Sequence, residues 1–295
     1  MHRYNQNHKD MSTRFNIKQV RRYYDRHTPE FVARGQGGFL GSIHRAVWAP
    51  GIRNREDAFR YVEHQIADRL GTLLEPNTLS RPHVIDLGCG IGSSLCTLAE
   101  RLNIRGTGIT LSPVQARIAQ QRIAQSGLSD RIRCIEADYC NLPNDCEIAD
   151  LAYAIESFVH AQDPTRFFTQ CANQIRPGGL LVICDDFRCP TNDPTSQQVV
   201  EKFCRGWHIN SLMSPTDFRD LAVRQGFEHI ETVDLTQYLE IGRPRDWLIA
   251  LGIYLFGWIP IVANRFDYLL GGNALQSCLS QGWVRYELAV FQRVG

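Results

Sequence analysis

The sequence of 295 residues has little net charge, because 32 Lys and Arg residues nearly balance 31 Asp and Glu residues and leave a formal charge of +1. A nucleic-acid partner carries dense negative charge and is usually matched by a strongly basic domain, so we expect no such partner. The chain also lacks internal repeats and low-complexity segments. With 43% hydrophobic residues it can bury a full core, and it is long for a single domain.

Signals for export and for disulfide bonds are missing as well. Residues 1–10 are polar and contain no apolar core, so they predict no signal peptide. Ten cysteines are scattered through apolar stretches, and no two of them form a C-x-x-C pair. We therefore expect reduced, mostly buried thiols, no metal site and a cytoplasmic location.

Residues 84–93 read V-I-D-L-G-C-G-I-G-S, a short apolar run with an acid followed by three glycines at alternate positions. The pattern predicts a strand, a tight turn and a helix, because glycine lets the backbone turn sharply and approach a ligand closely. The helix start beyond the turn favours negatively charged groups. The spacing G-x-G-x-G differs from the G-x-G-x-x-G of dinucleotide-binding turns, and such a turn is in some proteins purely structural.

Further segments continue an alternation of strands and helices through residues 82–186. Residues 106–115 predict a second strand and then a helix with Ser112 as N-cap and Pro113 in its first turn. More strands are predicted over residues 132–138, 149–156, 175–185, 227–235 and 284–291, and a helix starts at Ser214 and Pro215. The alternation predicts a doubly wound α/β fold, with a mostly parallel sheet and helices on both faces.

The turn at residues 84–93 resembles motif I of the class I S-adenosylmethionine-dependent methyltransferases. Residues 106–115 are similar to a segment of their tocopherol, sterol and cyclopropane-fatty-acid branch, and R-P-G-G at residues 176–179 is typical of such enzymes, natural-product (terpenoid) methyltransferases included. The resemblance implies a seven-stranded Rossmann-like core with S-adenosylmethionine as cofactor. It covers roughly residues 20–235 and says little about the substrate.

The resemblance also implies a set of cofactor contacts. The residues that would hold the methionine part of the cofactor surround the first turn: Asp86, Gly88, Gly90 and Gly92. Asp138 would accept the adenine amino group. The second strand of such sheets commonly ends in an acid that binds the ribose, but this chain has Thr110 there, and Thr110 and Gln115 would take over. Simpler interpretations stay open, with Gln115 as a solvated helix residue and Asp138 as a turn residue.

Glu156 stands at the end of the predicted strand 149–156, and His160 follows shortly after it. Ligands of doubly wound sheets lie beyond the carboxyl ends of the strands, so we expect both side chains near the transferred methyl group as catalytic residues. The segment E-S-x-x-H resembles one in tocopherol and sterol methyltransferases. A carboxylate there would stabilise a carbocation and then accept its proton, which favours methylation of carbon. Alternatively, Glu156 binds the backbone or the cofactor, and His160 caps a helix or packs in the core.

The chain ahead of the sheet predicts a disordered tail over residues 1–15 and a helical cover over residues 16–80, followed by a methyltransferase core over residues 81–295. Apolar residues recur with helical period over residues 57–74, and we expect that helix over the cofactor cleft. Tyr24, part of a Y-D pair, is a candidate catalytic residue. Trp48 and Arg45 are candidate substrate contacts, and a cation such as Arg45 suits a diphosphate or carboxylate. The alternatives are core aromatic residues and a solvated helix face.

About 50 residues, roughly 236–283, separate the last two predicted strands, where a minimal fold of this type has a short hairpin. Residues 247–263 contain no charge and come near the lower limit for spanning a bilayer. Glycines and a proline interrupt them, so we expect a helical lid over an apolar pocket. Three aromatic residues would face the substrate: Trp247, Tyr254 and Trp258. A membrane-surface or dimer contact and a transmembrane helix are the alternatives.

The sequence therefore predicts transfer of a methyl group from S-adenosylmethionine to a hydrophobic small molecule, with a carbon atom of a terpenoid or other isoprenoid natural product as the favoured acceptor. The alternative is N- or O-methylation of an apolar metabolite, such as an indole alkaloid or a quinone, with His160 or Glu156 as base. A third possibility is a cofactor-binding accessory subunit or peripheral membrane protein without turnover, which the complete set of motifs disfavours. A homodimer and contact with a membrane surface stay open.

Overall fold

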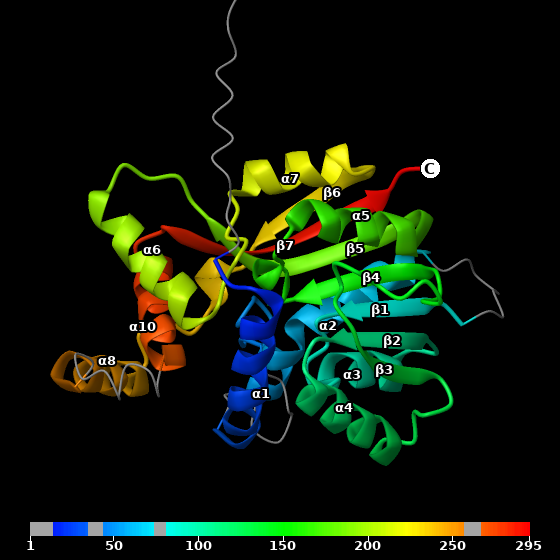
Figure 1. The fold of residues 1–295 in the computed structure, drawn as a ribbon, viewed down its shortest axis with the longest axis horizontal. Helices are drawn as coiled ribbons and strands as arrows, with labels where there is room; N and C mark the ends of the chain where they lie inside the picture. The colour runs from blue at the N-terminus through cyan, green and yellow to red at the C-terminus, as the bar shows by residue number, and fades with distance from the viewer. Residues whose placement is uncertain (1–13, 35–43, 74–80, 257–266) are drawn as a thin grey trace, which may run out of the picture.

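The computed structural model describes residues 14–34, 44–73, 81–256 and 267–295. Figure 1 shows a central sheet whose strands follow the order β3-β2-β1-β4-β5-β7-β6. The strands are β1 (His83–Leu87), β2 (Arg105–Thr110), β3 (Ile132–Glu136), β4 (Ala149–Ile155), β5 (Ile175–Arg188), β6 (Phe227–Asp234) and β7 (Val284–Arg293). Strands β1 to β5 pair in parallel, and β7 runs antiparallel to both β5 and β6. The predicted doubly wound, mostly parallel sheet is confirmed.

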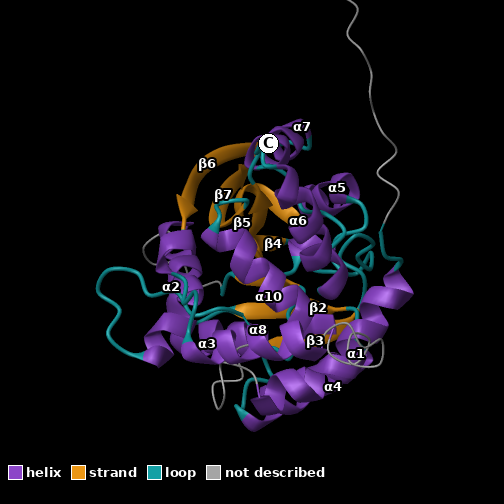
Figure 2. Cartoon of the chain, turned by 90° about the vertical axis from the view of Figure 1, so that its left-hand side faces the viewer, coloured by secondary structure: helices purple, strands orange, loops and turns teal. Residues whose placement is uncertain are grey.

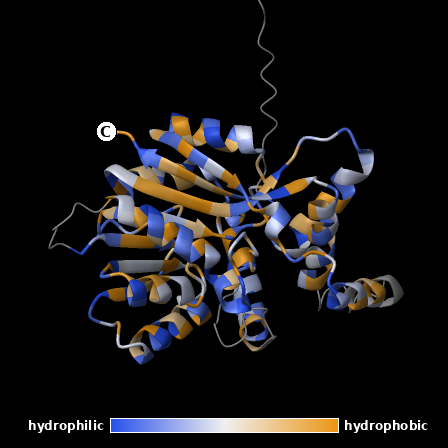
Figure 3. Ribbon diagram, turned by 180° about the vertical axis from the view of Figure 1, so that it is seen from behind, coloured by the Kyte–Doolittle hydropathy of each residue, from blue (hydrophilic) through white to orange (hydrophobic). Residues whose placement is uncertain are grey.

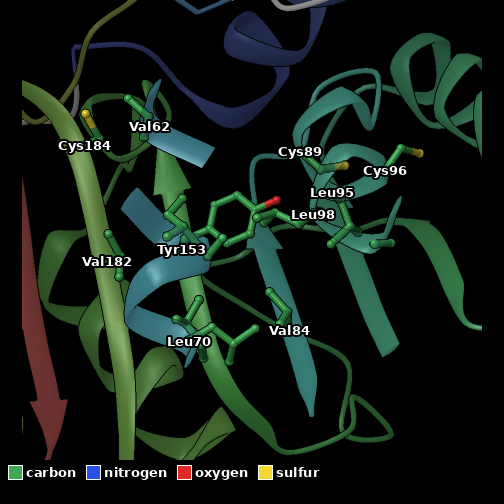
Figure 4. Packing of buried hydrophobic residues seen from close by; sticks show 14 of the residues in the cluster. Val62, Leu70, Val84, Cys89, Leu95, Cys96, Leu98, Tyr153, Val182 and Cys184 are labelled. Atoms are coloured by element: carbon green, nitrogen blue, oxygen red, sulfur yellow. The ribbon is translucent and has the colours of Figure 1, made fainter. Parts of the chain in front are cut away.

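Both faces of the sheet are buried under helices. On one face lie α2 (Arg55–Leu73), α3 (Ser93–Arg101) and α4 (Pro113–Gln125), and on the other lie α5 (Pro164–Gln174) and α7 (Pro215–Arg224). The central strands are therefore apolar on both sides, as their hydropathy in Figure 3 shows. In Figure 4, Val62 and Leu70 of α2 pack with Val84, Tyr153 and Val182 of three neighbouring strands.

Four helices, among them α6 (Pro194–Gly206), begin at a proline that follows a capping side chain. The caps are Ser112, Asp163, Asp193 and Ser214, and each accepts a hydrogen bond from a backbone N–H of the first turn. The fixed φ of proline suits the first helical position, where its missing N–H costs nothing. The predicted helix starts at residues 112–113 and 214–215 are confirmed.

Three helices from distant parts of the chain stand at the carboxyl ends of the parallel strands. They are α1 (Ile17–Arg34), α6 and α10 (Asp267–Ser280), and Figure 2 views the molecule from that side. α6 and α10 approach closely, because a Cβ atom at Gly206 would lie only 2.5 Å from the Cα of Gly271. Their apolar side chains form a small separate core that includes Trp283 and Val284. Ligands of doubly wound sheets bind at this edge.

The helix predicted over residues 57–74 is α2, but its expected place over the cofactor cleft is wrong. Val62, Ile66 and Leu70 are fully buried against the sheet, so the apolar face of α2 belongs to the core. α1 covers the strand ends instead. Residues 1–13 of the predicted tail lie outside the described residues, whereas Arg14 bonds to the carbonyl oxygen of Ile209 at 3.0 Å.

The long connection between β6 and β7 carries the short helix η3 (Thr236–Tyr238), then α8 (Pro244–Phe256) and α10. The expectation that its apolar residues turn inward is wrong for the described part of α8, where Trp247 is 72% exposed and Leu248 71%. α8 packs against α10 and stands out from the body in Figure 1. Within the described ranges, no helix is long and apolar enough to cross a membrane. The side chain of Tyr254 and all of Trp258 lie outside the described residues.

All ten cysteines are free thiols, and nine of them are buried. In the part of the chain that the structure describes, no three His, Cys, Asp or Glu side chains gather so that they could hold a metal ion. The cysteines therefore act as small hydrophobic residues of the core.

Candidate active site

A cavity of about 500 Å³ lies at the carboxyl ends of β1, β2, β4 and β5, within the size range of small-molecule sites. Its wall comes from α1, residues 44–46, the turns after these strands, residues 239–246 and α10. A second cavity of about 130 Å³ shares four lining residues with the first: Val20, Leu111, Tyr139 and His160. Together the two cavities follow the strand ends from β5 to β3.

The glycine-rich turn forms the wall after β1. Gly88 and Gly90 have φ angles of 95° and 52°, and both line the large cavity. A Cβ atom at Gly88 would overlap the side chain of Ser157, so only glycine lets the turn lie this close to the chain after β4. Gly92 does not line the cavity. A Cβ atom there would lie 3.1 Å from that of Ala119, so this glycine lets α3 and α4 approach each other.

Asp86 lies on the cavity wall beside this turn. The side chain is buried, and its carboxylate accepts a hydrogen bond from the hydroxyl of Tyr153 at 2.8 Å. Burial raises the pKa of Asp86 to about 7, although the hydrogen bond from Tyr153 lowers it. A positively charged group bound beside it would favour the ionised form, so Asp86 is suited to an ammonium group.

Thr110 and Gln115 are joined at the end of β2, where the Thr110 hydroxyl donates to Oε1 of Gln115 at 2.7 Å. Nε2 of Gln115 donates to Thr28 of α1 at 3.1 Å, and the glutamine is buried. The interpretation of Gln115 as a solvated residue is therefore wrong. Ser112 donates to Asp25 at 2.5 Å, so two side-chain contacts fix α1 to the turn between β2 and α4.

These residues fit S-adenosylmethionine. Three features follow one another along the ends of β1 and β2. They are the acid Asp86, which suits an ammonium group, the turn at Gly88, which has no room for a Cβ atom, and the hydrogen-bonded pair of Thr110 and Gln115. The resemblance assigns the first two to the amino acid of the cofactor and the pair to its ribose, and these contacts stay predictions. Asp138 follows β3, lines the smaller cavity and accepts a hydrogen bond from the backbone of Cys140 at 2.8 Å. Its contact with adenine stays a prediction.

Glu156 follows β4 directly on the cavity wall, and its carboxylate already has partners. Oε1 accepts hydrogen bonds from the backbone N and Nε of Arg45, at 2.8 and 3.0 Å, and from the hydroxyl of Tyr286 at 3.0 Å. Both terminal nitrogens of Arg45 donate to Asp186 at 2.9 Å. Burial alone would raise the pKa of Glu156, but the charges of Arg45 and His44, together with the hydrogen bonds from Arg45, outweigh burial and hold the pKa below its usual value. The expected contact of Arg45 with a substrate anion is therefore not supported.

His160 closes the short helix η2 (Phe158–His160), and both of its ring nitrogens are engaged. Nδ1 lies 3.1 Å from the carbonyl oxygen of His208, which can only accept, so Nδ1 carries the proton. Nε2 therefore accepts the hydroxyl proton of Tyr24 across 2.6 Å. Burial lowers the pKa of His160 to about 4, so its imidazole is neutral at neutral pH. Burial also raises the pKa of Tyr24, which stays protonated. Both side chains line the cavity.

The sequence reasoning missed two acids of β5, Asp185 and Asp186, which line the cavity. Asp185 accepts hydrogen bonds from the backbone N–H groups of Val159 and Asp186, and burial raises its pKa well above the usual value. The rule that placed Glu156 could have found both, because they also lie near the carboxyl end of a parallel strand. Tyr286 had no such signal, since only the pairing of β7 with β5 brings it opposite Asp186.

Two expected substrate contacts do not line the cavity. Trp48 packs with Ala46 and Phe59, and the exposed Trp247 donates its indole N–H to the carbonyl oxygen of Gly242. Other aromatic residues form the wall instead, and they come from α1, from the end of α6 and from α10: Tyr23, Phe31, Trp207 and Tyr268.

The comparisons with known proteins indicate the same class of enzyme and the same cofactor. A family described as methyltransferase domain matches residues 85–183. The O-methyltransferase cnsE of Penicillium expansum is 30% identical over 67% of this chain and 69% of its own. The [4+2]-cyclase SpnF has a similar structure, with a TM-score of 0.70 at 21% identity over 95% of this chain and 97% of that one. A geranyl diphosphate C-methyltransferase from Streptomyces coelicolor has a TM-score of 0.65 at 17% identity, over 94% and 98%.

A cyclase and a methyltransferase thus share the fold, so the fold alone does not fix the reaction. The matched domain covers the strands and turns that build the cofactor side of the cavity, and the fungal relative extends the similarity over two thirds of the chain. The chain belongs to the S-adenosylmethionine-dependent methyltransferases, and S-adenosylmethionine is its cofactor.

Proposed function

We propose that this enzyme methylates a hydroxyl oxygen of a hydrophobic small molecule of the natural-product type. The pair of Tyr24 and His160 carries the proposal, because it sets a phenol and a neutral imidazole 2.6 Å apart on the cavity wall. A hydroxyl group becomes a good nucleophile when it loses its proton, and this pair offers a route for that proton.

The bound cofactor supplies an electrophilic methyl group. The phenol oxygen of Tyr24 can accept the hydroxyl proton of the acceptor while its own proton passes to Nε2 of His160. The acceptor would gain a carbon–oxygen bond while the methyl–sulfur bond of the cofactor breaks and S-adenosylhomocysteine leaves, so the positive charge of the sulfonium would end on the imidazolium of His160. Burial disfavours that charge, and the carbonyl oxygen of His208 and the carboxylate of Glu156 offset part of this effect. Nδ1 keeps its proton on the carbonyl oxygen of His208 throughout.

The rest of the cavity suits an apolar acceptor. Apolar and aromatic side chains from α1, α6 and α10 form its wall, and they include Phe31, Trp207, Leu269, Leu275 and Leu279. Such a wall excludes water and holds rings through contact area. Among the lining residues that the structure describes, each arginine and His44 already contact a carboxylate, so an anionic acceptor would find no unpaired cation.

Methylation of a carbon atom in a terpenoid is the second candidate. The aromatic rings and the acids that line the cavity would stabilise a carbocation. Oxygen is preferred because Glu156, the carboxylate expected to face such a cation, is already bonded to Arg45 and Tyr286. Methylation of nitrogen would use the same pair of Tyr24 and His160.

The acceptor atom can be identified directly. The protein is given S-adenosylmethionine with a deuterated methyl group and a panel of apolar alcohols, phenols, quinols, alkenes and amines, and NMR locates the label in the product. Label on oxygen supports the proposal, and label on carbon contradicts it and favours the second candidate.

The role of His160 is tested by His160→Gln. We expect kcat to fall by at least about 100-fold, with the affinity for S-adenosylhomocysteine changed less than about threefold, because the imidazole accepts a proton but does not hold the cofactor. His229→Gln is the control, since it changes a half-buried histidine of β6 outside the cavity. A His160→Gln variant with wild-type kcat would rule out the imidazole as base.

A further inference from the structure

Arg45 joins parts of the molecule that lie far apart in the sequence. It belongs to the short segment 44–48 between α1 and α2, while Glu156 follows β4, Asp186 lies in β5 and Tyr286 in β7. Its guanidinium lies 4.0 Å above the ring of Tyr286 and binds Asp186 through both terminal nitrogens. The side chain is only 14% exposed. The planar fork of arginine matches a carboxylate in a way that lysine cannot.

The same residue also fixes the backbone around it. The N–H of Arg45 donates to Glu156 at 2.8 Å, and the next residues continue the attachment, with Val47 donating to Ala58 and Trp48 to Tyr238. Glu156 has a φ angle of 50°, in a region that residues other than glycine rarely adopt. Such a conformation persists when its surroundings hold it, and Arg45 bonds directly to this side chain.

We propose that Arg45 is a positioning residue for methyl transfer: it holds Glu156 and Asp186 as a fixed pair of carboxylates on the cavity wall and closes residues 44–48 against the sheet. The inference rests on methyl transfer, but not on which atom accepts the methyl group. Arg45 acts through the two carboxylates and needs no contact with the acceptor. The positive charge of Arg45 would suit a substrate anion, but Arg45 is bonded to the two carboxylates and favours their ionised form. The wall of the cavity therefore stays negative and suits a positively charged group.

The charge of this wall depends strongly on Arg45. The groups that face Glu156 come from five elements: Arg45 and His44, Tyr24, His160, Cys184 with Asp185 and Asp186, and Tyr286. His44 is bound to Glu63 at 3.0 Å, so Arg45 is the cation that the two carboxylates share. Without it, the pKa of Glu156 would rise, and the pKa of Asp186, which burial already raises with Arg45 in place, would rise further, so that one of the two would hold a proton at higher pH.

The experiment compares Arg45→Met with Arg45→Lys, which keeps the charge without the fork. Arg69→Met is the matched control, because Arg69 is 15% exposed and pairs with Glu231 away from the cavity. kcat is measured from about pH 5 to 9 at saturating cofactor and acceptor, on whichever acceptor the labelling panel identifies. Amide hydrogen exchange of residues 46–48 is measured in the free protein, without cofactor.

For Arg45→Met we expect kcat at neutral pH to fall at least about 100-fold, and the acid limb of the pH profile to move up by about one unit, because unpaired carboxylates hold protons more tightly. Exchange of residues 46–48 should become faster. Arg45→Lys should keep the position of the acid limb while kcat falls about tenfold. Arg69→Met should change none of the three. An unchanged pH profile with kcat within about threefold in Arg45→Met would overturn the inference.

Arg45→Met leaves two buried carboxylates without their cation, which can impair folding. The double variant Arg45→Met/Asp186→Asn is therefore measured beside it. If amide exchange of residues 46–48 in the double variant is as slow as in the wild type while kcat stays low, the inference is supported. If both the slow exchange and the wild-type kcat return, Arg45 only stabilises the structure. Label on carbon would overturn the proposed O-methylation, and an active His160→Gln variant would overturn the role of His160 as base. Both results would leave this comparison of Arg45 variants intact.

Discussion

The two segments that cover the cavity are attached to the rest of the molecule in opposite ways. The N-terminal segment, α1 with residues 44–48, is attached through buried polar contacts: Asp25 to Ser112, Thr28 to Gln115, Tyr24 to His160, and Arg45 to Glu156 and Asp186. The segment between β6 and β7 is attached through apolar packing of α10 on α6, and its helix α8 leaves Trp247 and Leu248 in solvent.

Polar contacts are directional, and removing one partner costs stability because the other polar group is left buried without a hydrogen bond. Apolar packing instead tolerates the exchange of side chains of similar size. The difference indicates a division of the cavity. The N-terminal segment fixes the cofactor side and the groups that handle charge, and the late segment shapes the acceptor side. Substitutions on the cofactor side should stop binding or chemistry, and substitutions on α10 should change which acceptor is used.

The largest effect is expected at the glycine turn. Gly88→Val should abolish measurable binding of S-adenosylhomocysteine, because the new Cβ atom would overlap Ser157 and the φ angle of 95° disfavours a branched residue. Gly51→Val is the control, since Gly51 has a φ of 92° but no atom within 4 Å of the added Cβ position. Calorimetry on both variants separates backbone strain from loss of the site. Near-native affinity in Gly88→Val would remove this turn from the cofactor site.

A moderate effect is expected from pH on the cofactor side. Asp86 has a pKa of about 7 in the free protein and must lose its proton to face an ammonium group. Affinity for S-adenosylhomocysteine should therefore be constant above that pH and fall about tenfold for each unit below it. Asp86→Asn should bind weakly at all pH values and lose the slope in calorimetric titrations. If the slope persists in that variant, another group titrates and the assignment of Asp86 fails.

The smallest effects are expected on the late segment, where two aromatic residues form a matched pair. Tyr268→Ala removes a ring from the cavity wall and should raise the KM for the acceptor about tenfold, with cofactor affinity within about twofold. Trp247→Ala removes an exposed ring of α8 and should leave both quantities unchanged. If Trp247→Ala raises the acceptor KM more than Tyr268→Ala does, α8 contacts the acceptor. The proposed division of the cavity would then be wrong for α8.

Predictions from sequence succeeded where a signal depends on neighbours in the chain. Ser112 and Pro113 start a helix because the cap and the first turn are adjacent, and both lie where the sequence placed them. Gln115 could be read as solvated because its partner Thr28 lies 87 residues earlier in α1. Gly92 was predicted to contact the cofactor along with Gly88 and Gly90, but it does not line the cavity, and only the packing of α3 on α4 shows its helix contact.

The sequence by itself determined the parallel sheet and the glycine turn, because these follow from residue types within a few positions of one another, and its resemblance to a known family implied the class of cofactor. The tertiary structure alone decided which side chains meet at the strand ends. Arg45 pairs with Glu156 and Asp186, which lie 111 and 141 residues away, and α1 rather than α2 covers the strand ends. A cation or an apolar stripe requires a partner without specifying which one, since Coulomb attraction and the hydrophobic effect have no preferred direction. The partner is fixed only when the whole chain packs around it.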